Sequence, residues 1–242
     1  MSAIKAVNLT KKYKEKTAVN NLNLEVNEGE LFALLGVNGA GKTTSIQLLS
    51  CILKPTSGDA LLLGKSLIKE SSEIKKSLNI SPQETAIAPK LTVKENLEFI
   101  AGIYGQNKKE AVSNAIIVAE TFGLTDEFNS KAKKLSGGMK RRLSIAMALI
   151  SNPKILFLDE PTLGLDVLSR RELWNAIKRL KGKVAIVLTT HYLDEVEALS
   201  DRVGIMTKGQ LSEVGTVSEI LEKTNTNSLE DAFVYLSGGC HE

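Results

Sequence analysis

A nine-residue stretch, Gly-Val-Asn-Gly-Ala-Gly-Lys-Thr-Thr at residues 36–44, constrains the fold more than any other part of the chain. It matches the phosphate-binding P-loop, in which a glycine, four further residues and a Gly-Lys-Ser/Thr triplet follow one another. A continuous apolar run precedes it at residues 31–35, as in a strand buried on both faces of a parallel sheet. Behind it, apolar residues recur at helical spacing until Pro55 and Gly58. Strand, loop and helix together predict an α/β fold built around this loop.

The same arrangement predicts a phosphate-binding site. Glycines let the backbone turn tightly with several N–H groups pointing inward, and a helix N-terminus adds about half a positive charge. Lys42 is expected to neutralise the outer phosphates of a nucleotide, and the Thr43 hydroxyl is a suitable ligand for the accompanying Mg²⁺. A glycine turn before an ordinary core helix is the alternative, and the flanking strand and helix disfavour it. The residues expected to contact the nucleotide are Gly36, Asn38, Gly39, Ala40, Gly41, Lys42, Thr43 and Thr44.

Composition is that of a globular protein with one large α/β domain, or with a core and a smaller inserted subdomain. The chain has 242 residues, a net charge of +3 and 43% hydrophobic residues. No apolar run approaches the roughly 20 residues that cross a bilayer, and residues 1–3 open no signal peptide, so work at a membrane would require another chain to span it. Cys51 and Cys240 lie far apart without ligand-like spacing, which indicates neither a disulfide framework nor a zinc site and predicts a reduced, cytoplasmic setting.

Basic residues cluster at 11–14, 131–134 and 140–142. Acidic residues nearly balance them over the whole chain, so we interpret these clusters as solvated surface. No binding of nucleic acid is expected.

Further elements are predicted around the P-loop. Alternating apolar residues at 4–9 and 22–26 predict half-buried strands of an antiparallel sheet. Tyr13 follows the first of them, at the tip of the hairpin, where stacking on adenine is favoured over a merely exposed aromatic. A capping box begins at Thr92, and segment 85–150 is mostly helical, as in a subdomain inserted into the core. Other helices are expected at 71–77, 109–122, 140–151 and 169–180, with a hairpin at 203–214 and a short helical tail.

Two adjacent carboxylates, Asp159 and Glu160, end a second buried strand at residues 154–158. An aspartate there, opposite a P-loop, is well placed to hold Mg²⁺. Because neighbouring side chains on a strand point to opposite sides, we expect Asp159 to bind the metal and Glu160 to orient or deprotonate the attacking water. His191 ends the buried strand at 184–190, on the same sheet edge, which favours contact with the γ-phosphate over a structural role.

Ser136-Gly137-Gly138 form a second possible phosphate cradle. They precede an amphipathic helix, which Ser136 could cap, and the small residues leave N–H groups at the helix start open to an anion. A solitary Ser-Gly-Gly is usually just a turn. The chain has only one P-loop and one metal carboxylate, however, so this second cradle has no nucleotide of its own.

In this combination and order, the motifs resemble those of the ATP-binding subunit of an ABC transporter. The resemblance covers residues 3 to about 215 and implies a P-loop NTPase fold: a RecA-like α/β core with an antiparallel β subdomain and an inserted α-helical subdomain. It implies residues 1–84 and 151–215 for the core with its β subdomain, 85–150 for the helical subdomain and 216–242 for a short C-terminal tail. The residues that carry it are Tyr13, GVNGAGKTT at 36–44, Gln83, LSGGM at 135–139, ILFLDEP at 155–161, LGLD at 163–166 and His191.

The resemblance also implies how such a subunit works. Two ATPase chains stack head to tail, and Ser136-Gly137-Gly138 of one closes over the ATP and Mg²⁺ held by the P-loop of the other. Gln83 is then expected to sense magnesium and the γ-phosphate, Asp166 to communicate across the dimer, and Glu160 to be the catalytic base. A separate transmembrane permease is the expected partner, which would hold this chain at the cytoplasmic face of the cell membrane.

Two departures from the family pattern are present. Met139 replaces the glutamine usual in the signature, and Leu163-Gly164 replaces the commoner Ser-Ala before Leu165-Asp166. With TTHYLDE at 189–195 and LEDAF at 229–233, they resemble the branch that energises ABC-2 type exporters of drugs, antibiotics, peptides or sodium. The alternatives are an importer ATPase, a soluble ABC ATPase acting on ribosomes or DNA, and an unrelated P-loop GTPase or kinase. No fused second ATPase domain, coiled-coil insertion or Asn-Lys-x-Asp guanine motif supports the last two. The transported substrate is expected to be chosen by the permease.

Overall fold

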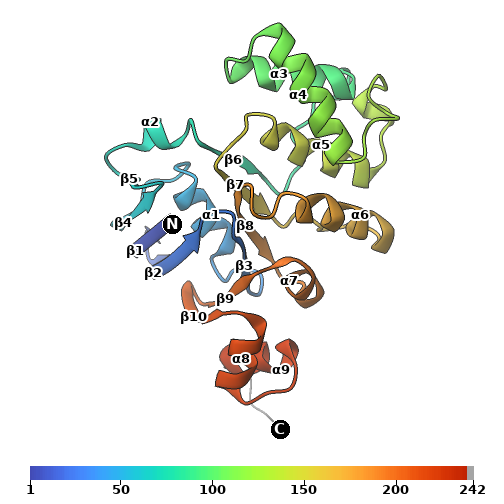
Figure 1. Cartoon of the computed structure of the whole chain (residues 1–242). Coiled ribbons are helices and arrows are strands. Elements are labelled where there is room, and N and C mark those ends of the chain that lie inside the picture. Colours follow the sequence, from blue (N-terminus) through green and yellow to red (C-terminus); the bar gives the residue numbers. More distant parts are fainter. Residues whose placement is uncertain (239–242) are drawn as a thin grey trace.

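The computed structural model describes residues 1–238 (Figure 1). It has the predicted mixed α/β architecture, with two sheets and helices around them. Cys51 is a free cysteine, and Cys240 lies outside the described residues. None of the helices within residues 1–238 is long and apolar enough to cross a bilayer.

The larger sheet has six strands in the order β10-β9-β3-β8-β7-β6. Neighbouring strands pair in parallel except β10, which forms an antiparallel hairpin with β9. Every residue of β3, β7 and β8 is buried, which confirms the strands predicted from continuous apolar runs. Because these three strands are parallel neighbours, their carboxyl ends meet at one edge of the sheet. The bounds are β3 (Leu31–Leu35), β6 (Leu78–Ser81), β7 (Ile155–Asp159), β8 (Ala185–Thr190), β9 (Arg202–Thr207) and β10 (Gln210–Gly215).

The smaller sheet is antiparallel, as predicted, with the order β2-β1-β4-β5. Its strands are β1 (Ser2–Tyr13), β2 (Lys16–Asn27), β4 (Ser57–Leu62) and β5 (Lys65–Ser66). Ile4 on β1 pairs with Val26 on β2 and with Leu62 on β4, and all three side chains are fully buried. They share a hydrophobic core with Phe32 of β3 and Ile46 of α1 (Lys42–Leu49). The helix that follows the P-loop therefore packs against both sheets.

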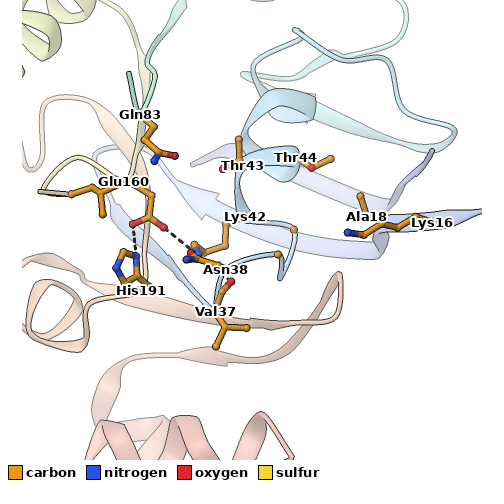
Figure 2. A pocket seen from close by; sticks show the side chains of 13 residues that line it. Lys16, Ala18, Val37, Asn38, Lys42, Thr43, Thr44, Gln83, Glu160 and His191 are labelled. Carbon is orange, nitrogen blue, oxygen red and sulfur yellow. Dashed lines mark hydrogen bonds and ion pairs between the residues drawn. The ribbon is translucent and has the colours of Figure 1, made fainter. Parts of the chain in front are cut away.

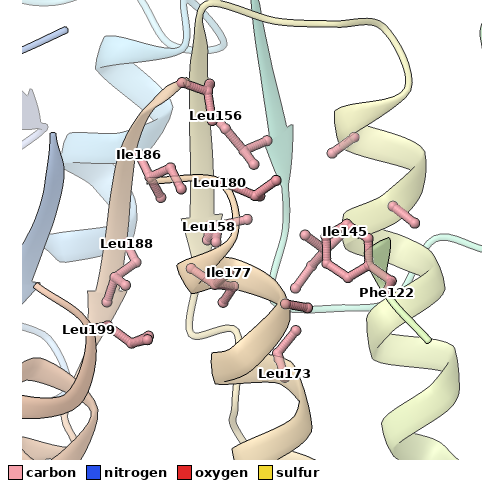
Figure 3. Close-up of a cluster of buried hydrophobic side chains, with 14 of the residues drawn as sticks. Phe122, Ile145, Leu156, Leu158, Leu173, Ile177, Leu180, Ile186, Leu188 and Leu199 are labelled. Atoms are coloured by element: carbon pink, nitrogen blue, oxygen red, sulfur yellow. The ribbon is translucent and has the colours of Figure 1, made fainter. Parts of the chain in front are cut away.

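The chain between β6 and β7 is mostly helical. It forms α3 (Val93–Ile103), α4 (Lys108–Thr121), the 3-10 turn η1 (Ala132–Lys134) and α5 (Gly137–Leu149), on the side of the larger sheet away from the smaller one (Figure 1). The predicted capping box is present: Glu95 N donates to Thr92 Oγ1 at 3.1 Å, and Thr92 N donates to Glu95 Oε2 at 2.7 Å. Phe122 and Ile145 pack in one hydrophobic cluster with Leu158 of β7 (Figure 3). These helices and the sheet thus share a core.

The remaining helices are α2 (Ser71–Ile74), α6 (Val167–Lys178), α7 (Leu193–Leu199), α8 (Val217–Thr224) and α9 (Leu229–Leu236). Two helices begin earlier than predicted because of their caps. α5 begins at Gly137 rather than at residue 140, since the Ser136 hydroxyl accepts a hydrogen bond from the backbone three residues on, at 3.2 Å. α6 begins at Val167 rather than at residue 169, since Asp166 caps it in the same way, at 2.9 Å. In contrast, α2 has one turn and ends before residue 77.

Candidate nucleotide-binding site

The P-loop, residues 36–41, connects β3 to α1, and its backbone is held by neighbouring elements. Gly36 N donates to Thr190 O, at the end of β8, at 3.3 Å. Gly41 has a φ of +106°, and a Cβ there would lie 2.4 Å from Ala18 O, so this position requires glycine. Within the described residues no side chain caps α1, which leaves N–H groups of its first turn available to an anion.

A cavity of about 300 Å³ lies beside this loop (Figure 2). Its lining comes from β2, the P-loop, α1 and the segments that follow β6, β7 and β8. Nine of the residues predicted to act on a nucleotide line it: Asn38, Gly39, Gly41, Lys42, Thr43, Thr44, Gln83, Glu160 and His191. The remaining lining residues, which were not predicted as nucleotide contacts, are Lys16, Ala18, Val37 and Leu163.

Glu160 lies between a lysine and a histidine in this cavity. Its Oε1 is 3.1 Å from Lys42 Nζ, and its Oε2 is 2.8 Å from His191 Nδ1 (Figure 2). The Glu160 and Lys42 side chains are 7% and 5% exposed, so water screens their attraction little. Glu160 also has a φ of +46°, which is strained for a residue other than glycine. Its N–H donates to Thr189 Oγ1 at 3.0 Å, which holds the strained backbone in place. Strain of this kind gathers at functional sites.

Asp159 provides oxygen ligands next to the P-loop. Its Oδ1 accepts hydrogen bonds from Thr43 Oγ1 at 3.2 Å and from Thr189 Oγ1 at 2.5 Å. Carboxylate and hydroxyl oxygens are the hard donors that Mg²⁺ prefers. Asp159 is 4% exposed and does not itself line the cavity, whereas Thr43 and Gln83 do. Residues 1–238 contain no cluster of three or more His, Cys, Asp or Glu that could hold a metal. The oxygen atoms of Thr43 and Asp159, with the Gln83 amide nearby, have the chemistry that suits Mg²⁺.

Three of the residues predicted to contact the nucleotide of their own chain do not line the cavity. Gly36 and Ala40 lie within the P-loop, where Ala40 is 2% exposed and its N–H donates to Val37 O at 3.1 Å. Tyr13 is 44% exposed, and Lys11 Nζ lies 5.2 Å from the centroid of its ring. Its strand partner Lys16 does line the cavity. Stacking of Tyr13 on adenine remains a prediction.

Ser136-Gly137-Gly138 and Asp166 lie together, away from the cavity of their own chain. A Cβ on Gly138 would be 2.6 Å from Ser169 Oγ, so the start of α5 packs directly on α6. Ser169 Oγ donates to Asp166 Oδ2 at 2.7 Å, and the hydrogen bonds from the Ser169 backbone and hydroxyl lower the pKa of the Asp166 carboxyl. Ser136, Gly137 and Asp166 are exposed. The second cradle and Asp166 thus form one surface cluster.

The interpretation of residues 140–142 as solvated surface is wrong for Arg141, which is 4% exposed. Burial lowers the pKa of its guanidinium to about 10, although Asp159 and Glu195 act in the opposite direction. Helical spacing contained the signal: the buried residues Gly138, Arg141, Ile145 and Ala148 recur every three or four positions. Sequence reasoning also missed Thr189, whose hydroxyl bonds both Asp159 and the Glu160 backbone but which reads as an ordinary strand residue.

Comparison with known proteins agrees with this geometry. A family model described as "ABC transporter" matches residues 19–163. The human "Phospholipid-transporting ATPase ABCA3" is 42% identical over 220 residues, which cover 89% of this chain but only 13% of that protein. The "Linearmycin resistance ATP-binding protein LnrL" of Bacillus subtilis (strain 168) is 38% identical over 227 residues, 93% of this chain and 73% of that protein. A solved dimer of the ATP-binding cassette MJ0796, in a post-hydrolysis state bound to ADP and Pi, has a TM-score of 0.79 at 28% identity and covers 88% of this chain and 98% of that one.

Proposed function

Since this chain belongs to the ABC transporter family, as an ATP-binding domain with ATPase activity, we propose that it powers an exporter through a separate membrane permease. The observation that carries the proposal is the cavity of Figure 2, in which a P-loop lysine, a strand-end glutamate and a histidine converge. A relative named for linearmycin resistance favours export over import.

Nucleotide binding in this proposal uses the groups around the P-loop. The backbone N–H groups of the loop and Lys42 bind the phosphates of ATP, and Tyr13 stacks on the adenine. Thr43, Asp159 and Gln83 would hold Mg²⁺, which would neutralise charge on the phosphates. The hydrogen bond of 3.2 Å between Thr43 Oγ1 and Asp159 Oδ1 supports this assignment, because it brings two hard oxygen donors together beside the phosphate cradle.

Hydrolysis depends on Glu160 and its two partners. Lys42 Nζ contacts Glu160 Oε1 at 3.1 Å and donates to Gly36 O at 2.7 Å. Phosphate oxygens compete with Glu160 for this ammonium group, so phosphate binding weakens the ion pair and makes the carboxylate available to accept a proton from water. His191, which bonds the other oxygen of Glu160, orients the carboxylate and contacts the γ-phosphate.

Two copies of the chain stack head to tail, so that Ser136-Gly137-Gly138 of each faces the ATP held by the other. This arrangement gives the second cradle a ligand that its own chain does not offer. Beside Asp166, Val167 and Leu168 are 57% and 73% exposed, which is apolar surface suited to burial against a second copy. ATP contacted from both chains favours the closed dimer, and its hydrolysis removes that bridge.

The permease docks on the helical segment and passes the motion of the dimer to the membrane. Phe99 and Ile103 of α3 are 60% and 63% exposed, and Tyr104, which caps its C-terminus, is 43% exposed. Tyr104 also lines a groove shared with Met147 of α5 and with Pro82, the residue before Gln83. A permease segment in this groove would touch the loop that carries Gln83 and would hold the chain at the cytoplasmic face of the cell membrane.

Replacing Glu160 by glutamine tests the proposed chemistry. Glu160→Gln in the full chain should leave ATP binding within about twofold and lower turnover by at least about 100-fold, because the amide cannot act as a base. With ATP the variant should accumulate as a dimer in size-exclusion chromatography. Glu120→Gln, at an exposed position on α4, is the control and should match the wild type. Unchanged turnover would remove Glu160 as the base, and a monomer at saturating ATP would remove the dimer.

The proposed partner is tested by gentle extraction of the tagged chain from its native membranes, followed by mass spectrometry. A co-purifying polytopic membrane protein is the expected result. Ribosomal or DNA-bound material, with the chain absent from membranes, would contradict the transporter proposal while leaving the ATPase chemistry unchanged.

A further inference from the structure

Arg141 has an unusual set of partners for a buried cation. It lies in the second turn of α5, which packs beside β6 and β7 (Figure 1). Its guanidinium forms no ion pair within residues 1–238, and all its hydrogen bonds go to backbone carbonyls. Nε donates to Pro161 O at 2.8 Å, Nη2 donates to Asp159 O at 2.8 Å, and Nη1 donates to Gln83 O at 3.2 Å and also to Pro82 O.

These carbonyls belong to the two segments that place the reacting groups. Asp159 and Pro161 are the residues on either side of Glu160, so Arg141 holds the backbone of the proposed base from both sides. Pro82 and Gln83 belong to the loop after β6, whose glutamine lines the nucleotide cavity. One side chain therefore joins both segments to a single helix.

That helix begins with the second cradle. Ser136 caps α5, and Gly138 lies three residues, less than one helical turn, before Arg141. A helix moves as a rigid body over so short a distance, so a displacement of Ser136-Gly137-Gly138 also displaces the guanidinium. The carbonyls around Glu160 and Gln83 must then follow, or lose buried hydrogen bonds to a cation.

An arginine side chain is better suited than any other to bind several backbone carbonyls of two separate segments at once. Its planar group carries five donors in a fixed fork and reaches four backbone carbonyls at once, whereas a lysine ammonium is a compact point charge. A hydrogen bond that does not involve Arg141, at 3.3 Å between the Ser81 and Ser144 hydroxyls, also connects α5 to the end of β6.

We propose that Arg141 is a positioning residue that couples the two nucleotide sites of the dimer: when the partner's ATP engages Ser136-Gly137-Gly138, Arg141 aligns Glu160 and Gln83 of its own chain. The inference rests on the head-to-tail dimer proposed above. It adds a route by which occupancy of one site controls hydrolysis at the other, carried by hydrogen bonds rather than by contact with either nucleotide.

The test is the ATP dependence of hydrolysis by the purified full chain carrying Arg141→Lys. With two coupled sites the wild type should have a Hill coefficient above 1, up to about 2. Arg141→Lys should lower kcat by about tenfold or more and bring the Hill coefficient to about 1. The Kd of ATP for the monomeric chain should stay within about twofold of the wild-type value. Arg141→Gln, which is neutral and carries two donors, is the second variant and should lose cooperativity in the same way.

Arg142→Lys is the matched control, since it makes the same change one residue further along α5. Arg142 Nη1 donates to Phe122 O at 3.0 Å, and Nη2 lies 3.2 Å from Glu172 Oε2, so neither contact reaches the nucleotide cavity. This control should keep the Hill coefficient and keep kcat within about twofold, even if its thermal stability falls as far as that of Arg141→Lys.

The outcomes separate this inference from the dimer itself. A cooperative wild type with an equally cooperative Arg141→Lys would overturn the coupling role alone. So would equal losses in Arg141→Lys and Arg142→Lys, which would indicate a general effect on folding. A wild type that hydrolyses ATP without cooperativity would overturn the shared sites and this inference with them.

Discussion

At the scale of single residues, Glu195 is a buried carboxyl that the proposed chemistry does not use. It is fully buried on α7, where Trp174 Nε1 donates to its Oε1 at 3.2 Å. Burial raises the pKa of Glu195, surrounding hydrogen bonds oppose that rise, and the nearby Glu160 carboxylate adds to it. Arg141 is the cation that interacts with it. The folded environment therefore holds the carboxyl proton of Glu195 more tightly than water does.

The protonation of Glu195 makes a prediction about stability. The pKa of Glu195 is higher in the folded chain than in the unfolded chain. The protonated carboxyl therefore contributes fully to the free energy of unfolding below the unfolded pKa, and this contribution is lost as pH rises through the folded pKa. Glutamine does not ionise, so Glu195→Gln does not lose this stability as pH rises. The melting temperature of the variant minus that of the wild type should therefore increase from pH 5 to pH 8, by about 2–4 °C for each kcal/mol of unfolding free energy that the wild type loses. Calorimetry at both pH values measures the difference. A difference that shrinks with pH would mean that ionised Glu195 stabilises the fold.

At the scale of elements, helix caps connect local structure to the proposed dimer. Asp166 caps α6 through Oδ1, and its Oδ2 accepts from the same Ser169 that fills the space beside Gly138. The start of α6 and the start of α5 are therefore placed by one serine. A change at this cap should affect both helix starts.

Comparing Asp166→Asn with Asp166→Ala distinguishes the effect of the helix cap from that of the negative charge. Asp166→Ala should lower the melting temperature by about 2–4 °C, whereas Asp166→Asn should keep most of the stability, because asparagine caps as well as aspartate. If Asp166 communicates across the dimer, as the family resemblance implies, ATPase activity should fall in both variants. Full ATPase activity of Asp166→Asn would mean that Asp166 serves only as the N-cap of α6.

At the scale of the whole molecule, the P-loop cavity and the second cradle lie apart on one chain, and the dimer is proposed to unite them. If this proposal is correct, a dimer of one chain with a defective P-loop and one chain with a defective cradle has both defects in the same nucleotide site, and its other site is intact. A chain with a defective P-loop still offers an intact cradle, and a chain with a defective cradle still offers an intact P-loop.

Mixing two inactive variants tests this requirement. Lys42→Ala and Ser136→Ala should each be inactive alone. Equal mixing should restore activity that neither variant has alone, at most about a quarter of wild-type ATPase, because half of the dimers are mixed and each contains one intact site. If Arg141 couples the two sites, the recovered activity should be lower by a further factor of about ten, because the second site of each mixed dimer holds no ATP. Each variant incubated alone at the same total concentration is the control. No recovery on mixing would mean that each site is built within one chain.

Much of the fold and part of the site could be predicted because the signals are local. The run at residues 31–35, the glycines after it and the helical spacing beyond them are neighbours in sequence. Glu160 and His191 each follow a buried strand, and carboxyl ends of parallel strands meet at one sheet edge, so their convergence with Lys42 could be expected. The starts of α5 and α6 differ from the prediction by two or three residues: Ser136 was expected as a cap although the helix was placed from residue 140, and the cap at Asp166 was not expected.

By itself, the sequence determined the two sheets, the P-loop and nine of the thirteen residues that line its cavity. Hydrophobic periodicity and turn chemistry depend on adjacent residues, and the order of the motifs supplied the rest. Tertiary structure alone decided the partners of long polar side chains. Arg141 stands between two basic residues and reads as surface, yet it bonds carbonyls 18 to 59 residues away. Only the packing of α5 against β6 and β7 buries it, since burial of a polar group depends on elements that the chain brings together from distant positions.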